Sequence, residues 1–97
     1  MSEIVTQAVA AMSAKVDGGF ESSAKFVIED EGVVIIDGDG VRAGEADEDT
    51  EVTLTASVET FQGIMDGEVN PTMAFMSGKL KIDGSMTAAM KLASVLG

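Results

Sequence analysis

The stretch "DGDGVRAGEADE" contains five of the chain's 17 acidic residues. Asp37, Asp39 and Glu48 match the first, third and twelfth positions of a calcium-binding loop. Val41, however, occupies a position that needs an oxygen ligand, and Arg42 occupies the position where the loop requires glycine. These two mismatches favour a tight Asp-Gly turn followed by a solvated acidic loop, and they predict no metal site.

Other catalytic chemistry has little support in the sequence. Gly38, Gly40 and Gly44 do not form a phosphate-binding loop, because no lysine follows them and the next predicted element is a strand. The chain has no histidine and no cysteine, which removes the usual general base, the commonest zinc ligand and any thiol nucleophile. No pair of carboxylates stands out as an acid–base couple. We therefore expect a protein that is not an enzyme and that has no cofactor.

Length, charge and composition narrow the class of protein. The 97 residues predict a single domain over residues 1–97, and the mean hydropathy of +0.24 favours a compact fold. The net charge of −11 disfavours nucleic acid as a partner and allows at most transient contact with anionic membranes. No segment resembles a signal peptide or a membrane span, the final "SVLG" is not a peroxisomal signal, and cysteine is absent. A small soluble cytoplasmic protein is the expectation.

Hydrophobic periodicity and turn residues predict nine elements in the order α-β-β-β-β-α-α-β-α, an α+β fold. The four consecutive strands indicate a meander. The predicted elements are a helix from Ser2 to the "DGGF" stop at 17–20, strands near 24–29, 33–36, 41–43 and 51–56, helices at 57–67 and 71–76, a strand at 79–83, and a helix at 85–96.

Capping residues support the predicted helix boundaries. Ser57 is typical of a helix N-cap, and Gly67 of a helix end. Asn70 followed by Pro71 is a cap with proline at the first helical position, and Gly78 ends the short helix that follows. The acidic loop precedes the fourth strand.

Methionine is unusually frequent. Five of the seven methionines, Met65, Met73, Met76, Met86 and Met90, lie in the last third of the chain. A single methionine usually fills a gap in the core, whereas a group of them suits a surface that adapts to varied apolar ligands. Both interpretations remain open at this level.

The stretch "MDGEVNPTMAFMSGKLKIDGSMTAAMKL", residues 65–92, resembles the C-terminal signature of the sterol carrier protein 2 (non-specific lipid-transfer) family. The matching features are Asn70-Pro71, the run 78–82, Gly84 and the run 89–92. The first half of the chain agrees in its order of elements and in its "GVVIIDGDGV" hairpin.

The resemblance implies a five-stranded, mainly antiparallel sheet covered by helices, with an apolar tunnel between them. Such a tunnel takes up fatty acids, sterol-like lipids or phospholipids, so the expected function is lipid binding or transfer. The alternative is a non-catalytic accessory module that binds enzymes of lipid or isoprenoid-quinone metabolism and keeps only a vestigial cavity. The inward-facing apolar residues expected to line the tunnel are Phe26, Ile28, Val34, Ile36, Leu54, Phe61, Ile64, Met65, Met73, Phe75, Met76, Leu80, Ile82, Met86 and Met90.

An empty tunnel is energetically costly for so small a domain. A cavity of ~300 Å³, at about 24 cal/mol per Å³, destabilises by roughly 7 kcal/mol, against a total stability of ~5–15 kcal/mol. We therefore expect the tunnel to be filled with lipid that co-purifies, or closed by inward collapse of its helices, or bounded by a mobile last helix.

Overall fold

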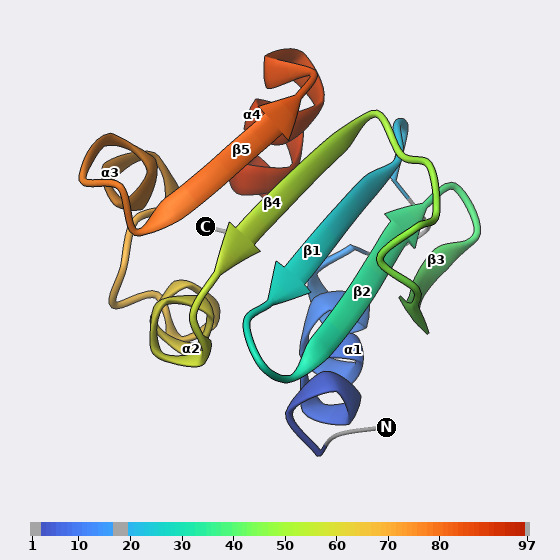
Figure 1. Cartoon of the computed structure of the whole chain (residues 1–97), viewed down its shortest axis with the longest axis horizontal. Helices are drawn as coiled ribbons and strands as arrows, with labels where there is room; N and C mark the ends of the chain where they lie inside the picture. The colour runs from blue at the N-terminus through green and yellow to red at the C-terminus, as the bar shows by residue number, and fades with distance from the viewer. Residues whose placement is uncertain (1–2, 17–19, 97) are drawn as a thin grey trace.

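The structure is a computed structural model, and it describes residues 3–16 and 20–96 (Figure 1). The described residues form four helices and five strands in the predicted order. The elements are α1 (Glu3–Lys15), β1 (Ala24–Ile28), β2 (Gly32–Asp37), β3 (Gly40–Gly44), β4 (Val52–Ala56), α2 (Val58–Asp66), α3 (Pro71–Met76), β5 (Leu80–Gly84) and α4 (Met86–Leu96). Ser2 and residues 17–19, predicted to start and stop the first helix, lie outside the described residues.

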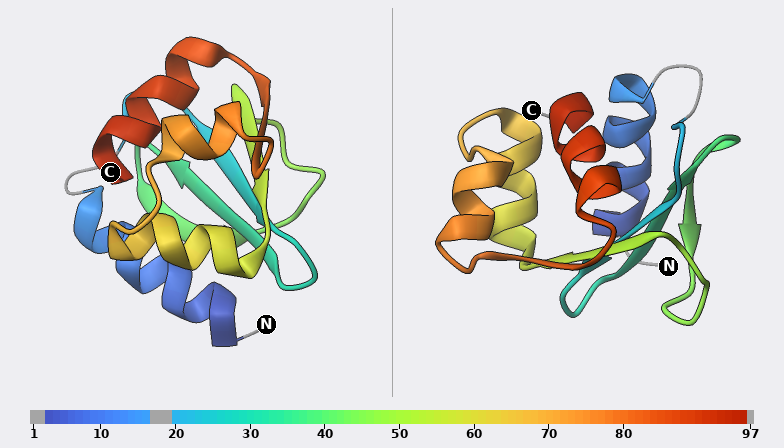
Figure 2. Two further views of the ribbon diagram at one scale, coloured as in Figure 1. Left: turned by 90° about the vertical axis from the view of Figure 1, so that its left-hand side faces the viewer. Right: turned by 90° about the horizontal axis from the view of Figure 1, so that it is seen from above.

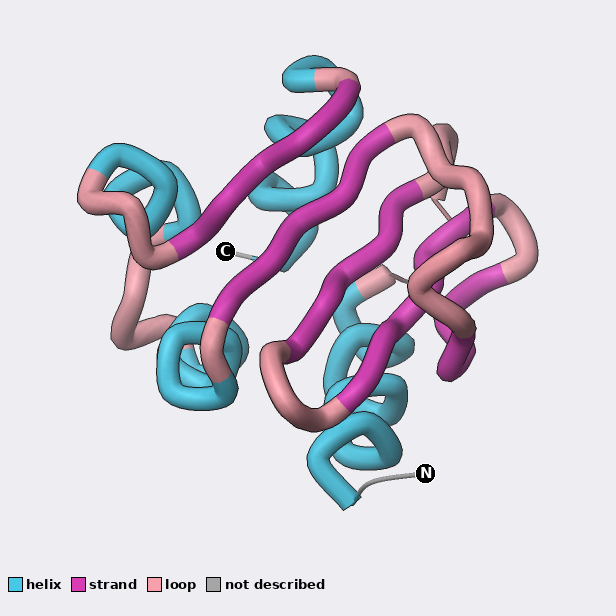
Figure 3. The backbone as a smooth tube through the Cα atoms, viewed as in Figure 1, coloured by secondary structure: helices cyan, strands magenta, loops and turns pink. Residues whose placement is uncertain are grey.

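The five strands form one sheet in the order β3-β2-β1-β4-β5, and its chain path is traced in Figure 3. Three of the four strand pairs are antiparallel, and the β1–β4 pair is parallel. The predicted meander of four strands is therefore wrong, because β4 does not continue beside β3. The segment 45–51 carries the chain back across the sheet, and β4 pairs with the free edge of β1, which satisfies the backbone groups of that strand.

All four helices lie on one face of the sheet (Figure 2). The alternating burial of β1 and β4 places Phe26 and Leu54 on this inner face, where they are neighbours in the strand register. α1 packs on β2 and β3, α4 packs on β4, β1 and β5, and α3 packs on β5. A single apolar cluster joins the inner face of the sheet to the helices. No helix in the described part of the chain is both long and apolar enough to cross a bilayer.

The strand β2 is buried on both faces. Val34 and Ile36 point to the helices, whereas Ile35 points to the outer face and is still only 1% exposed. The segment after β3 folds over Ile35, and the Nζ atom of Lys25 donates hydrogen bonds to the carbonyl oxygens of Ala46 and Glu48. Because the helices cover one face of β2 and the segment after β3 covers the other, nearly every residue of this strand can be apolar, as is typical of a central strand.

The predicted caps are confirmed in the structure. The Ser57 hydroxyl accepts a hydrogen bond from the Thr60 amide at 3.2 Å, and Gly67 ends α2 in the left-handed conformation with φ 82°. Asn70 caps α3 with Pro71 at the first helical position. Ser85, predicted to open the last helix, is its N-cap, and its hydroxyl accepts from the Ala88 amide at 3.2 Å.

Candidate functional site

The predicted lining residues fall into three groups by burial. Eight are buried in the apolar core: Phe26, Ile28, Val34, Ile36, Leu54, Phe61, Ile64 and Leu80. Two are half-buried against this core: Met65 and Ile82. Five are exposed: Met73, Phe75, Met76, Met86 and Met90. The predicted lining residues therefore lie partly in the packed core and partly on the surface. The candidate sites lie where buried and exposed members of this set are neighbours.

One such place is an apolar slot between the β4–β5 half of the sheet and the helices α3 and α4. Its lining consists of Leu54, Pro71, Thr72, Phe75, Leu80, Ile82, Ala89, Met90 and Ala93, among which no side chain is charged. Leu54 and Ile82 form its floor as partners in the β4–β5 register. Ala89 and Ala93 leave space above them, because they lie one turn apart on α4 and have short side chains. The slot measures about 20 Å³, which is room for one water molecule.

The outer wall of the slot is built from a short helix and two exposed side chains. Phe75 on α3 and Met90 on α4 line the slot while they are 40% and 50% exposed. The helix α3 has only six residues, and the two glycines that flank it, Gly67 and Gly78, both have φ of 82°. Hinges are commonly found at such short connections, so outward movement of α3 would widen the slot.

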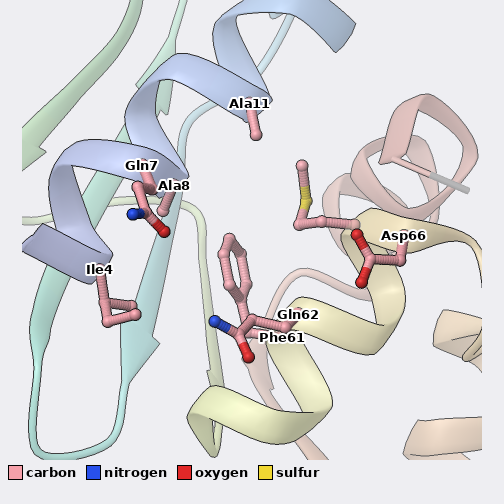
Figure 4. A pocket seen from close by; sticks show the side chains of 8 residues that line it. Ile4, Gln7, Ala8, Ala11, Phe61, Gln62 and Asp66 are labelled. Atoms are coloured by element: carbon pink, nitrogen blue, oxygen red, sulfur yellow. The ribbon is translucent and has the colours of Figure 1, made fainter.

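A second cavity lies between α1 and α2 and measures about 360 Å³ (Figure 4). Its lining consists of Ile4, Gln7, Ala8, Ala11, Phe61, Gln62, Met65 and Asp66, whose side chains approach one another from the two helices. The ring of Phe61 forms the inner end of this cleft and packs edge-on against Phe26, with 4.9 Å between the ring centroids. The cleft is wider than the slot, but Gln7, Gln62 and Asp66 make its wall partly polar.

Hydrogen bonds from Arg42 and from the backbone hold the acidic loop. Both carboxylate oxygens of Glu48 are held by the Arg42 guanidinium, at 2.7 and 3.2 Å, and one of them also accepts from the Glu45 amide at 2.8 Å. These hydrogen bonds, the one from Arg42 first, lower the pKa of Glu48 from its ordinary value of 4.5 to about 2. The Asp37 carboxylate accepts from the Asp39 amide at 2.9 Å, as in an Asx turn. Among the described residues, no three acidic side chains gather where they could hold an ion.

A comparison with protein families identifies the family to which the chain belongs. The model of the SCP-2 sterol transfer family matches residues 5–97. The chain belongs to this family. Its resemblance to the C-terminal signature of that family, expected from residues 65–92, is confirmed.

Individual relatives place the family domain in longer proteins. The chain is 41% identical over 59 residues to hydroxysteroid dehydrogenase-like protein 2 of Bos taurus, which covers 61% of this chain and 14% of that protein. It is 36% identical over 76 residues to sterol carrier protein 2 of Homo sapiens, which covers 78% of this chain and 13% of that protein. The chain therefore spans about one seventh of the length of these two relatives.

A solved structure confirms the fold of this SCP-2 family domain. Sterol carrier protein 2 of Aedes aegypti, in complex with palmitate, aligns with a TM-score of 0.76 over 100% of this chain and 97% of that one. The sequence identity is 18%, so the similarity concerns the fold. The predicted five-stranded, mainly antiparallel sheet covered by helices is confirmed.

Sequence reasoning missed several residues that line the slot and the cleft of this SCP-2 domain. Ala89, Ala93 and Pro71 line the slot, and Ala11 and Gln62 line the cleft. The search for large apolar side chains passed over them, because a cavity forms where side chains are small. The useful signal was the spacing of Ala89 and Ala93, which puts two small residues on the same face of an otherwise apolar helix.

Proposed function

We propose that this chain is a non-catalytic carrier of a single-chain lipid such as a fatty acid, and that the hydrocarbon occupies the slot after α3 moves outward. The observation that carries this proposal is the slot itself, which has no charged lining and has Phe75 and Met90 in its outer wall. At about 20 Å³ it is far below the ~300 Å³ of an ordinary ligand pocket, so binding requires opening. Burial of each methylene contributes ~0.8 kcal/mol, which offsets the cost of that movement over a long chain.

Membership of the SCP-2 sterol transfer family supports a lipid as the class of ligand. The Aedes aegypti protein with the same fold is described as a complex with palmitate, a C16 fatty acid. A fatty acid has a single chain, which suits a slot with one flexible wall. This is the form of lipid that we assign to the site.

The same observations favour a carrier over an enzyme. The sequence has neither histidine nor cysteine, and Glu48, the carboxylate with a strongly lowered pKa, is bound to Arg42 on the face of the sheet opposite the slot. The longer relatives carry further sequence that this chain does not match, so their enzymatic names describe those whole proteins. We place the carrier in the cytoplasm, a setting that the lack of cysteine fits.

Titration with a fluorescent fatty acid tests the proposal. Wild-type protein should show saturable binding with micromolar affinity. Ala93→Leu, which fills the slot, should weaken binding at least roughly tenfold, since it removes about the space of three methylene groups. Ala14→Leu makes the same change on the exposed surface of α1 and should bind as the wild type does.

A third variant separates the two cavities. Ala11→Leu narrows the cleft between α1 and α2 and should leave binding unchanged. If Ala11→Leu abolishes binding and Ala93→Leu does not, the lipid occupies the cleft, and the assignment to the slot is wrong. If the wild type shows no saturable binding, the carrier proposal fails in favour of an accessory module that binds partner enzymes.

A further inference from the structure

The strand β5 forms an open edge of the sheet. It is the last strand in the order β3-β2-β1-β4-β5, and none of the described residues forms a further strand beside it. The left-hand view of Figure 2 looks onto this edge, where β5 lies next to α3. The strand contains no proline, and its register with β4 contains no bulge. Proteins commonly use these two features to protect an edge, so the edge of β5 can accept a further strand.

Alternate residues of β5 point their backbone groups away from β4. In an antiparallel pair, residues that exchange hydrogen bonds with the partner strand alternate with residues that do not. The Ser85 amide donates to the Glu51 carbonyl at 2.9 Å, and this bond continues the β4–β5 register. Residues of β5 that lie an even number of positions before Ser85 therefore bond to β4, and the residues between them point away. The backbone groups that face the open edge are those of Leu80, Ile82 and Gly84.

The charged side chains of β5 are free to pair across this edge. Lys81 and Asp83 are exposed on the outer face of the sheet, whereas Ile82 between them packs against the core on the helix side. Within the described part of the chain neither charged side chain is in an ion pair. Lys79, directly before the strand, adds a second positive charge at its start. The strand therefore begins with positive charge and ends with negative charge.

Charge selects one register for pairing β5 with β5 of a second copy. Two identical strands related by a twofold axis perpendicular to the sheet run antiparallel, and their edge-facing groups meet only if the axis passes at a residue. An axis at Lys81 places lysine opposite lysine, and an axis at Asp83 places aspartate opposite aspartate; both arrangements are destabilising. An axis at Ile82 instead places Lys81 of each copy opposite Asp83 of the other. The same register brings the edge-facing Leu80 opposite Gly84 of the second copy.

The charged pairs lie where side chains of two strands approach most closely. In the register centred on Ile82 the edge-facing residues exchange the hydrogen bonds. Lys81 and Asp83 of the second copy then form a non-hydrogen-bonded pair, in which the Cα atoms lie ~4.5 Å apart. Their neighbours on β4, Thr55 and Thr53, are uncharged. The twofold axis produces this ion pair twice.

An exposed apolar surface adjoins the edge. Among the described residues, all those with an exposed large apolar side chain belong to α3 and α4, the helices before and after β5 in the chain. Two of these side chains, Phe75 and Met90, line the slot together with Ile82. A strand of five residues is short for the ~800 Å² that each partner of a stable interface buries. A second copy at this edge would extend its contact onto the exposed helices and gain the missing area.

We propose that this chain forms a symmetric dimer in which β5 pairs with β5 of a second copy, centred on Ile82, so that the two sheets become one continuous sheet. The backbone groups at the edge supply the hydrogen bonds, and the reciprocal pairs of Lys81 and Asp83 determine the register. A second copy fits this edge because the charges of β5 complement themselves under a twofold axis. This inference goes beyond the carrier function and does not depend on it.

Sedimentation of charge variants over a concentration series tests the register. The wild type should dimerise. Lys81→Glu places like charges opposite one another in both symmetry-related pairs and should raise the Kd of the dimer at least roughly tenfold. Asp83→Lys should do the same with positive charge. Lys15→Glu changes the net charge as Lys81→Glu does, but at the exposed end of α1, and should leave the Kd near the wild-type value.

A mixture of two variants gives a sharper result. In a heterodimer of Lys81→Glu with Asp83→Lys every charge on one strand faces the opposite charge on the other. The equimolar mixture should therefore form heterodimers with a Kd close to that of the wild type, although each variant alone dimerises weakly. Failure of the mixture to associate more tightly than the separate variants would contradict the register centred on Ile82.

Hydrogen exchange locates the contact on the strand. The Ile82 amide faces the open edge, so raising the wild-type concentration should slow its exchange at least roughly tenfold. The same amide should stay unprotected in Lys81→Glu. A wild type that is monomeric at millimolar concentration overturns the dimer. A dimer that Lys81→Glu and Lys15→Glu weaken equally, or that leaves the Ile82 amide unprotected, overturns the strand pairing and points to the exposed helices as the contact.

Discussion

The guanidinium of Arg42 and the carboxylate of Glu48 lie 2.7 Å apart, and this ion pair closes the loop that follows β3. Arg42 and Lys25 are the register partners of Ile35 on its two sides, so the two cations flank Ile35 on the outer face of the sheet. Arg42 binds the Glu48 side chain, and Lys25 binds the Glu48 carbonyl at 2.9 Å. Glu48 thus binds both cations, Arg42 through its side chain and Lys25 through its carbonyl oxygen. The loop that contains Glu48 shields Ile35 from solvent.

Acidification should weaken this arrangement. The pKa of Glu48 is lowered from its ordinary value of 4.5 to about 2 in the folded protein, mainly by the hydrogen bond from Arg42. A lowered folded-state pKa contributes stability that is fully present above the unfolded value and is lost as the pH falls toward the folded value. We expect Glu48→Gln to be less stable than the wild type at neutral pH, with the difference shrinking between pH 4.5 and about 2.

Urea denaturation at a series of pH values measures this effect. Asp47→Asn removes a neighbouring exposed carboxylate and serves as the control for the change in net charge. The difference in free energy of unfolding between Asp47→Asn and the wild type should not change with pH in the way that it does for Glu48→Gln. Identical pH profiles for the two variants would mean that total charge, and not the ion pair, sets the acid stability of the loop.

The loop at 45–51 also decides the one feature of the sheet that the sequence did not predict, which is the position of β4. The order of the nine elements was predictable, because apolar periodicity and capping residues such as Ser57 and Asn70 act locally. The parallel pairing of β4 with β1 was not predictable in the same way. It depends on the acidic segment 45–51, whose polar sequence has no periodicity. This segment is held in part by hydrogen bonds from other elements, such as those from Lys25 on β1 and Arg42 on β3.

The candidate site was predictable only in part, for a related reason. The inward positions of Leu54 and Ile82 followed from the alternation of polar and apolar residues. Alternation identifies the face that a side chain points to, but not whether a neighbour or a cavity meets it there. The exposure of Met73 and Met76 shows the same ambiguity on α3, because the composition of a short helix does not determine which side is covered.

Gly84 is placed so that no side chain fits. A Cβ atom there would lie 2.5 Å from the Glu51 carbonyl oxygen and 3.0 Å from the Val52 Cα, and the residue has φ of +111°. Gly84→Ala should therefore lower the free energy of unfolding by more than the ~1–3 kcal/mol that backbone strain alone costs. Gly40 has φ of +121°, and no atom lies within 4 Å of a Cβ placed there. Gly40→Ala should therefore lower the free energy of unfolding only by the cost of backbone strain. Equal losses in denaturation experiments would contradict the close approach at Gly84.

The cap of α3 should control how fast lipid reaches the slot. The Asn70 side chain accepts hydrogen bonds from the amides of Thr72 and Met73, at 2.8 and 3.3 Å. Asn70→Ala should cost about 1 kcal/mol of stability and make α3, which is too short to be stable by itself, open more often. Uptake of a fluorescent fatty acid in stopped-flow measurements should then be faster than in the wild type.

The matched control for this prediction is Ser57→Ala, which removes the equivalent cap of α2. Its loss of stability should be similar, because the same kind of hydrogen bond is removed. Its uptake rate should stay at the wild-type value, since α2 does not line the slot. If both variants accelerate uptake equally, the rate reports overall stability and not the movement of α3.

Ligand binding should raise the thermal stability of the wild type by more than it raises that of the slot variant Ala93→Leu. An open slot of ~300 Å³ with nothing inside would cost roughly 7 kcal/mol, which explains why the walls close to about 20 Å³. A fatty acid at ~100 times its Kd stabilises the folded state by about 2.7 kcal/mol, which for a domain of this length raises the melting temperature by roughly 10–20 °C. At the same fatty-acid concentration Ala93→Leu, with binding at least roughly tenfold weaker, should gain no more than about 1.4 kcal/mol and so about half of this rise, whereas Ala14→Leu should show all of it. Mass spectrometry of an organic extract should find a single-chain lipid with the purified wild type and much less with Ala93→Leu. A wild type that neither carries lipid nor gains stability from added fatty acid would mean that the closed slot is an ordinary part of the core.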